Sequence, residues 1–299
     1  MNRIITLCIA ILAAALGATA QVRSIGAITE ARARGANEST RLRVPVAAKA
    51  ADADAALYAD VERRGLWYEG IGPKLTEAAA AKLPLYFRLS MRNGAGRWQY
   101  VQALCGGKPS AAHHLSPYAL DKDADVDSVA GDWQRQLRGV VQWMLIPDAD
   151  GRTLAEERAY RADGNLVYSF VPVRNADGRI TGSYSDDLGL PVDMRPDSTA
   201  TYGSVVWLRL DESGRVDEVD FLDGRGMRKY SPMGVDRERL FYDADGRLAV
   251  RLMLNVGGQP MRDRHGNAGY RYVRRADGTP TDTLTYTVDE VLNLYPRIR

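Results

Sequence analysis

The chain has 299 residues, with 40 Lys and Arg against 38 Asp and Glu, and a formal net charge of +2. This length is enough for one large domain or two smaller ones with an ample core. The charges are mixed in sign and nearly balanced, so nothing in the composition favours nucleic acid or an anionic membrane surface as a partner.

The first 20 residues have the three parts of a secretory signal peptide. A positively charged start precedes an apolar run over 4–17, and Ala18 and Ala20 then have the small-residue spacing that signal peptidase accepts. The apolar run is about 14 residues long, whereas a membrane span needs roughly 20. We therefore expect cleavage, a mature chain that begins at or near Gln21, and a periplasmic or secreted protein.

The sequence allows two other fates of this segment. An uncleaved 4–17 segment would anchor the chain, and would then be its only attachment to a membrane. Cys8 follows Leu7 as in a lipoprotein signal, but it lies inside the apolar run and not after it, which argues against lipid attachment. No later stretch is long and apolar enough to span a bilayer.

Cleavage would leave Cys105 as the single cysteine of the mature chain, which excludes an intrachain disulfide. Gly106 and Gly107 follow it and indicate a turn, and the surrounding residues match no thiol-protease signature. We interpret Cys105 as a buried structural thiol. An intermolecular disulfide or a nucleophile are the alternatives.

Residues 21–46 are polar and rich in Arg, Ala, Ser and Thr, and we expect a flexible leader. The 47–64 segment is Ala-rich, and its apolar residues between 57 and 61 have helical spacing. Gly65 stands where a helix C-cap belongs, so the pattern predicts a helix that ends there.

A second, short helix is predicted over 76–82, before Pro84. Aromatic and β-branched runs at 85–89 and 98–101 then predict a hairpin, because Asn93-Gly94 lies between them and Asn-Gly is a strong hairpin signal. The apolar 133–146 segment fits a helix or a strand, and its β-branched residues favour a strand near its end.

The second half of the chain is punctuated by Asp-x-x-Gly or Asp-Gly units. They begin at or contain Asp148, Asp163, Asp177, Asp211, Asp243 and Asp277. An aspartate side chain accepts hydrogen bonds from the backbone that follows it, and glycine adopts the positive φ of a turn. Between alternating apolar and polar runs, such units predict hairpin turns.

The turn glycines also recur with a period, which indicates structural repeats. The first set, spaced by about 32 to 36 residues, is Gly178, Gly214, Gly246 and Gly278, and a second glycine follows the first three at Gly189, Gly226 and Gly258. Each unit would be two or three short antiparallel strands, which cannot bury an apolar face alone but can do so by stacking.

The fold class predicted from these patterns is α+β, mainly antiparallel β. A small α+β region over 47–140 would continue into a β-meander of repeated hairpin units over 141–295. The two regions could share one sheet and form one domain.

The segment Tyr242-Asp-Ala-Asp-Gly-Arg-Leu248 resembles the tyrosine–aspartate (YD) repeats of bacterial RHS-type proteins. The looser Asp-Gly turns are similar to the β-repeats of exported or surface-exposed bacterial proteins. This resemblance covers about half of the chain, and only Tyr242-Asp243 keeps the Tyr-Asp pair. RHS proteins carry dozens of repeats that form a large shell, for which this chain is too short. The resemblance implies a β-meander in an extracytoplasmic setting and brings no catalytic residues.

One acidic stretch has the carboxylate spacing of a calcium loop. Its candidate ligands are Asp121, Asp123, Asp125, Asp127 and Asp132. Val126 stands where such a loop needs glycine, and Asp132 replaces the usual bidentate glutamate. We keep these residues as a candidate calcium site, against the alternative of a solvated acidic loop; no other cofactor is predicted.

No catalytic constellation stands out in the sequence. The histidines of the chain are the adjacent pair His113-His114 and the separate His265, with no HExxH motif and no Cys/His cluster. The nucleophile elbow Gly-x-Ser-x-Gly is missing as well. We therefore assign no catalytic residue.

Aromatic residues line the strands of the second half, and four of them are candidates for a binding surface: Trp207, Tyr242, Tyr270 and Tyr272. Exposed on a sheet, such rings would stack on sugars or anchor a protein partner. The alternative is an ordinary role in the core and in cross-strand pairs.

From the sequence we expect an exported, non-enzymatic binding or scaffold protein that acts through its β-repeat surface on an envelope protein or a glycan. One alternative is a secreted hydrolase or toxin-like enzyme that uses the acidic stretch and His113-His114. The other is a sensor ectodomain held by an uncleaved 4–17 segment.

Overall fold

The computed structural model describes residues 55–91, 98–111, 139–149, 151, 153–191, 205–223, 225–231, 233–274 and 280–295. The predicted signal peptide and leader, the candidate calcium loop at 121–132 and His113-His114 lie outside these residues. Neither of the described helices is long and apolar enough to cross a membrane.

The main element is one 14-stranded antiparallel sheet in which the strands follow the order of the chain. In spatial order they are β1 (Ala55–Tyr58), β4 (Tyr86–Ser90), β5 (Tyr100–Cys105), β7 (Val140–Pro147), β8 (Leu154–Arg161), β9 (Leu166–Arg174), β10 (Ile180–Ser185), β11 (Val205–Leu210), β12 (Val216–Leu222), β13 (Arg237–Tyr242), β14 (Leu248–Leu254), β15 (Gly269–Arg274) and β16 (Pro280–Tyr286), with β6 (Lys108–Pro109) beside β5. This confirms the mainly antiparallel β class, and strands of both predicted regions belong to the same sheet.

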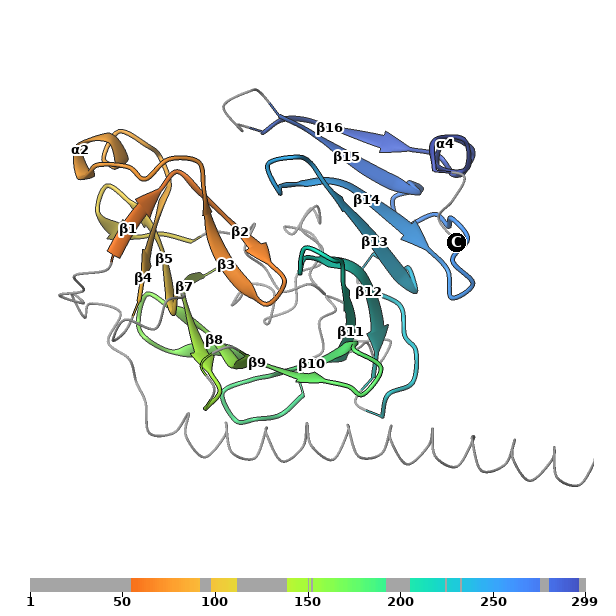
Figure 1. Cartoon of the computed structure of the whole chain (residues 1–299), viewed down its shortest axis with the longest axis horizontal. Helices are drawn as coiled ribbons and strands as arrows, with labels where there is room; N and C mark the ends of the chain where they lie inside the picture. The colour runs from red at the N-terminus through yellow and green to blue at the C-terminus, as the bar shows by residue number, and fades with distance from the viewer. Residues whose placement is uncertain are drawn as a thin grey trace, which may run out of the picture.

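Two strands, β2 (Asp60–Arg64) and β3 (Trp67–Ile71), leave this order and form a hairpin of their own. Figure 1 shows the sheet curling from β1 through β9 and β10 towards β16, with the hairpin on its concave side. Val61, Leu66 and Tyr68 of the hairpin belong to the largest core cluster. We call the side of the sheet that packs against this hairpin the inner face, and the other side the outer face.

The side chains of the inner face come from alternate residues along each strand. Leu208 of β11 and Val219 and Phe221 of β12 point inward and are fully buried, while Arg209 and Asp220 between them point outward. Each such buried apolar side chain contributes about 1.5–3 kcal/mol relative to an exposed one. The period of two in the sequence therefore directs one side of each strand into the core.

The helix predicted over 47–64 is wrong for the described part of that segment, which forms β1 and β2. Ala56 and Tyr58 pack into the inner core, whereas Leu57 packs on the outer side against Ala80. A strand covered on both faces has consecutive apolar residues. Here the spacing of these apolar residues also matched the period of a helix. Tertiary packing here overrides the helix propensity of alanine.

The short helix predicted over 76–82 is confirmed as α2 (Glu77–Ala80). The Thr76 side chain accepts a hydrogen bond from the backbone N–H of Ala79 at 3.2 Å and caps its first turn. Ala80 is buried against Leu57 and Leu104, so α2 covers the outer side of the sheet near β1.

The predicted hairpin is confirmed as β4 and β5, although its turn lies outside the described residues. Cys105 ends β5 and is exposed, so the interpretation as a buried thiol is wrong. Gly106 and Gly107 form the predicted turn to β6, which keeps Cys105 on the surface. The apolar 133–146 segment is a strand from Val140 onwards, as its β-branched residues indicated.

The Asp-x-x-Gly turns are confirmed wherever they are described. At Asp211, the carboxylate Oδ1 accepts the backbone N–H groups of Ser213 and Arg215, both at 2.9 Å, and the Gly214 N–H donates to the Asp211 carbonyl at 3.0 Å. Burial raises the pKa of Asp211, but the hydrogen bonds from Ser213 and Arg215 outweigh it and hold the pKa below its ordinary value. This is the three-residue hairpin loop in which the glycine forms a bulge.

A last helix, α4 (Val288–Leu294), was not predicted. Thr287 and Glu290 form a capping box, which is the sequence signal that could have found it. Val291 is fully buried against Val250 and Leu252 on the outer face, so α4 covers the C-terminal part of the sheet.

Candidate binding surface

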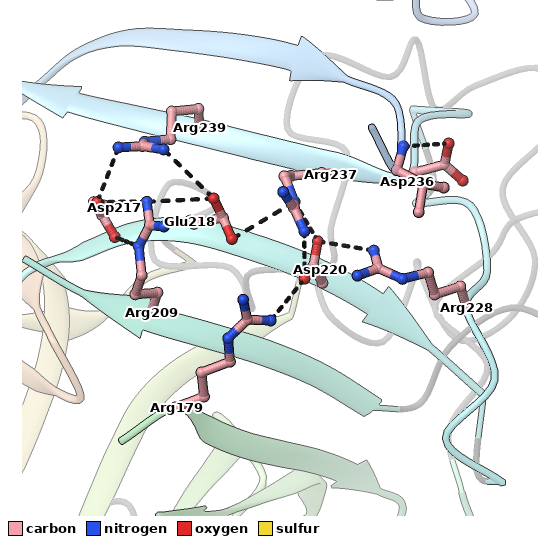
Figure 2. A network of polar contacts seen from close by, with 10 residues as sticks. Arg179, Arg209, Asp217, Glu218, Asp220, Arg228, Asp236, Arg237 and Arg239 are labelled. Atoms are coloured by element: carbon pink, nitrogen blue, oxygen red, sulfur yellow. Dashed lines mark hydrogen bonds and ion pairs between the residues drawn. The ribbon is translucent and has the colours of Figure 1, made fainter. Parts of the chain in front are cut away.

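The outer face of β10–β13 carries a network of charged side chains that the strand register brings together. Asp220 of β12 pairs with Trp207 of β11 and with Arg237 of β13, and Glu218 pairs in the same way with Arg209 and Arg239. We use the name arginine network for Arg179, Arg209, Arg228, Arg237 and Arg239 with Asp217, Glu218 and Asp220, which Figure 2 shows.

Asp220 is the centre of one half of this network, with 1% of its side chain exposed. Arg237 donates to both of its oxygens, from Nε at 2.6 Å and from Nη2 at 3.1 Å. Arg228 reaches Oδ1 at 3.2 Å, and Arg179 reaches Oδ2 at 3.4 Å. Three guanidinium groups therefore enclose one buried carboxylate.

The other half is built around Asp217 and Glu218. Arg209 forms a bidentate pair with Asp217, at 2.9 Å for each of its two bonds, and lies 3.3 Å from Glu218. Arg239 contacts both carboxylates, at 3.4 and 3.5 Å. Arg237 joins the two halves, because its Nε also lies 3.6 Å from Glu218 (Figure 2).

The electrostatics of the network suit recognition of a partner and not proton transfer. Burial lowers the pKa of Arg237, but the hydrogen bond and charge of Asp220 outweigh this effect and raise the pKa above its ordinary value. The hydrogen bond from Asp217 likewise raises the pKa of Arg209. Both arginines stay protonated at physiological pH, so neither can act as a general base. The network contains five guanidinium groups and three carboxylates, which gives these eight residues a formal net charge of +2.

A row of exposed apolar side chains lies beside this network. We use the name turn rim for Leu188, Leu190, Met227, Tyr230 and Val256, which are 70, 57, 63, 49 and 49% exposed. They lie in or just after the turns that end β10, β12 and β14, and each turn is closed by its second glycine, Gly189, Gly226 or Gly258. These three strands run in the same direction, so their turns share one end of the sheet, about 10 Å apart from one to the next.

Two features place the turn rim beside the arginine network. Arg228 directly follows Met227 and reaches back to Asp220. Asp236, just before β13, accepts the backbone N–H of Val256 at 3.2 Å (Figure 2). Met227 and Val256 of the turn rim therefore lie close to Arg228 and Arg237 of the network.

The four aromatic candidates for a binding surface lie in different parts of the structure. Trp207 lies half-buried on the outer face beside the arginine network, with the Arg179 guanidinium 6.0 Å from its ring centre. Tyr242 packs against the main core and donates from its hydroxyl to the Val216 carbonyl at 2.6 Å. Only Trp207 adjoins the candidate surface.

Tyr270 and Tyr272 lie on the inner face of β15, in a small cluster with Met253. Tyr270 is buried, and its hydroxyl donates to the carboxylate of Asp263. Tyr272 is half-buried. These two rings fill the core at this end of the sheet, as in the alternative interpretation of the aromatic pattern.

The candidate calcium ligands at 121–132 lie outside the described residues. Within the described ranges, no three His, Cys, Asp or Glu side chains are grouped to hold a metal ion. His265 lies on the surface in the turn of Asp263, whose Oδ1 accepts its backbone N–H at 2.9 Å.

The inner face also holds charged groups, but these groups are buried and paired with one another. Glu157 of β8 is fully buried, and it accepts hydrogen bonds from Arg63 of the hairpin at 2.7 and 2.9 Å and from Tyr168 at 2.7 Å. Burial and then the charge of Glu157 raise the pKa of Tyr168 well above its ordinary value. Glu238 and Arg251 form a second buried bidentate pair, at 2.6 and 2.9 Å. Both pairs are buried.

Comparison with known proteins yields no family for this chain. No protein-family model and no curated protein sequence matches it. The resemblance of Tyr242–Leu248 to YD repeats therefore stays a prediction from the sequence.

The arginine network and the turn rim were not predicted from the sequence. The signals were present as closely spaced charges at Asp217-Glu-Val-Asp220 and Arg237-Glu-Arg239, and as an apolar residue within two positions of each second turn glycine. Only the strand register shows that these segments are neighbours.

Proposed function

We propose that this chain is an exported, non-enzymatic binding or scaffold protein, and that a protein of the cell envelope docks on its turn rim and arginine network. The observation that carries this proposal is the turn rim itself. The ends of three successive same-direction strands, β10, β12 and β14, project large apolar side chains into solvent at one end of the sheet.

The composition of this surface supports a protein partner. Protein interfaces are enriched in Met, Tyr, Trp and Arg relative to the rest of the surface, and their binding energy is concentrated in a few such residues. Met227 and Tyr230 supply apolar anchors here, and Arg228 lies between them in the chain. An arginine can pack its stem on an apolar partner and pair its guanidinium with a carboxylate.

The export signal and the YD-like repeats support an envelope partner, since both indicate an extracytoplasmic setting. The sealed ion pairs of the inner face support a binding role over an enzymatic one, because the charged groups described there are occupied by each other. The alternating side chains of a repeat sheet are suited to recognition of a protein surface.

The test is crosslinking and affinity capture of the tagged mature chain from its native envelope, with mass spectrometry of the captured proteins. We expect one protein at near-equal amount. Met227→Asp and Leu190→Asp should each reduce its recovery about tenfold, which corresponds to about 1.4 kcal/mol.

The matched control is Leu284→Asp in β16, where a leucine of comparable exposure, 44%, lies within a strand and not in the turns of the rim. This variant should capture the partner as well as the unchanged chain does. Equal recovery with all three variants would place the partner elsewhere, and a clean monomer with no captured protein would contradict the proposal.

A further inference from the structure

Two cations of the arginine network are not needed to balance its carboxylates. Arg209, Arg237 and Arg239 together contact all three carboxylates and match their negative charge. Arg179 and Arg228 are additional to this balanced set, and we use the name excess arginines for these two residues. They account for the net positive charge of the network.

The excess arginines use little of their capacity to donate hydrogen bonds. A guanidinium group has five N–H donors. Within the described residues, each of these side chains makes one hydrogen bond, from Arg228 to Oδ1 of Asp220 at 3.2 Å and from Arg179 to Oδ2 at 3.4 Å. Arg237 already donates to the same two oxygens, at 2.6 and 3.1 Å. Since the excess arginines are 33 and 32% exposed, their remaining donors are open to a ligand from solvent.

Asp220 holds the two excess arginines near each other on the outer face. Arg179 approaches it from β10 and Arg228 from the segment after β12, so the buried carboxylate lies between the two guanidinium groups (Figure 2). Acidic side chains two residues apart in an extended segment are separated by roughly 7 Å and lie on the same side of that segment. Such a segment can place one carboxylate on each excess arginine.

The acidic residues closest in sequence to the excess arginines have other partners. Oδ1 of Asp177 accepts the backbone N–H of Arg179 at 3.0 Å, within its own turn. Oδ1 of Asp223 accepts the backbone N–H of Met227 at 3.0 Å, and Oδ2 lies 3.8 Å from the ammonium group of Lys229. These carboxylates therefore close turns and do not pair with the guanidinium groups of the excess arginines.

Apolar side chains lie beside both excess arginines. Met227 and Tyr230, which are 63 and 49% exposed, flank Arg228 in the chain. The half-buried ring of Trp207 lies 6.0 Å from the Arg179 guanidinium. A free anion would use the charges alone, whereas a protein segment with acidic and apolar residues would use both kinds of side chain.

We infer that the envelope partner binds this surface with an acidic segment, whose carboxylates pair with Arg179 and Arg228 while its apolar side chains contact Met227 and Tyr230. Arginine matches the geometry of a carboxylate and forms charge-assisted hydrogen bonds with it. Asp220 is a positioning residue, because it holds both guanidinium groups in place. The inference rests on the proposed function for the identity of the partner, but its charge chemistry can be tested without that partner.

The experiment measures fluorescence anisotropy of a labelled hexaglutamate peptide titrated with the mature chain at low ionic strength. The unchanged chain should bind the peptide, added sodium chloride should weaken binding by screening, and hexalysine should not bind. The double variant Arg179→Gln with Arg228→Gln should bind hexaglutamate about tenfold more weakly. It should remain folded, because Arg237 still donates to both oxygens of Asp220, and circular dichroism checks this.

The matched control is Arg88→Gln on β4, near the N-terminal end of the sheet. The Arg88 side chain is 37% exposed and lies 3.8 Å from Glu77, so this variant removes an equally exposed cation away from the network. It should bind hexaglutamate as the unchanged chain does. Absence of binding to the unchanged chain, or equal binding by the double variant, would overturn the inference.

Two further outcomes separate this inference from its alternatives. Sodium phosphate that displaces the peptide, where sodium chloride of equal ionic strength does not, would assign the site to phosphate groups and overturn an acidic segment. Recovery of the captured partner that falls with Met227→Asp but not with the double variant would support the proposed function and overturn this inference. Peptide binding that the double variant loses, without any captured protein, would contradict the proposed function and support the acidic-ligand site.

Discussion

Arg63 and Glu157 show how single residues hold the hairpin of β2 and β3 on the inner face. The Arg63 side chain is 11% exposed and the Glu157 side chain 0%, and the two are joined by two hydrogen bonds. A buried ion pair adds little net stability over an apolar pair, but removal of one partner leaves an uncompensated charge. The contact therefore specifies where the hairpin lies more than it strengthens the fold.

Arg63→Ala should lower the free energy of unfolding by about 3–5 kcal/mol, because it leaves the Glu157 carboxylate buried without its cation. Urea denaturation measures this change. The control is Arg64→Ala, since Arg64 is 47% exposed and pairs with the exposed Glu69, and it should change stability by less than about 1 kcal/mol. Equal effects of the two substitutions would show that the buried pair does not hold the hairpin.

The double variant Arg63→Met with Glu157→Leu removes both charges from the inner face. It should recover most of the stability lost in Arg63→Ala, because no buried charge then lacks a partner. If the double variant is as unstable as the single one, loss of packing and not the unpaired carboxylate is the cause.

At the scale of elements, the turn of the β2–β3 hairpin is docked on the turn between β11 and β12. Gly65 has φ +59°, and a Cβ atom placed on it would lie 2.3 Å from the carbonyl oxygen of Gly214. Glycine is thus needed at Gly65 for two reasons, the left-handed backbone and the close approach of another turn. The sequence identified Gly65 as a terminator, but assigned it to the end of a helix.

Gly65→Ala should destabilise the chain more than Gly72→Ala. Gly72 also has a positive φ, +79°, but nothing lies within 4 Å of its Cβ position, so alanine there costs only the backbone strain of roughly 1–2 kcal/mol. At Gly65 the two turns must also move apart, which adds about 1–3 kcal/mol. Denaturant midpoints of the two variants give the comparison, and equal midpoints would show that the turns do not depend on this contact.

Elements also differ in how far they could be predicted. The helix over 76–82, the β4–β5 hairpin and the Asp-x-x-Gly turns were predicted because their signals are local. β1 and β2 were missed because the same residues, Ala56 to Val61, suit a helix until α2 and the inner core cover them from two sides. The turn rim was missed because its residues are ordinary surface residues one by one.

For the whole molecule, the largest core cluster runs from Ala56 of β1 to Leu240 of β13, so it includes strands of both predicted regions. The hairpin adds contacts across the curled sheet, including Arg274 of β15 with Glu62 of β2 at 3.3 Å. These contacts connect parts of the chain that the order of strands keeps apart. The 47–140 and 141–295 regions should therefore not be independently stable.

We expect the mature chain to unfold in one cooperative transition, because loss of either region would expose the shared core. Tryptophan fluorescence reports the environments of the five tryptophans, among them the buried Trp143, and far-ultraviolet circular dichroism reports the whole sheet. The two signals should give the same urea midpoint. Two separated midpoints would instead support two domains divided near residue 140.

The sequence by itself determined the turns and the alternation of the strands. The Asp211 turn needs only hydrogen bonds among residues 211–215. Contacts of such short range depend only on residues that are neighbours in the sequence. The tertiary structure decided that 55–64 is strand, that one hairpin leaves the sheet to fill its inner face, and that Arg179 meets Asp220. The physical reason is that these features depend on packing and ion pairs between residues far apart in the chain, which no local pattern of propensity contains.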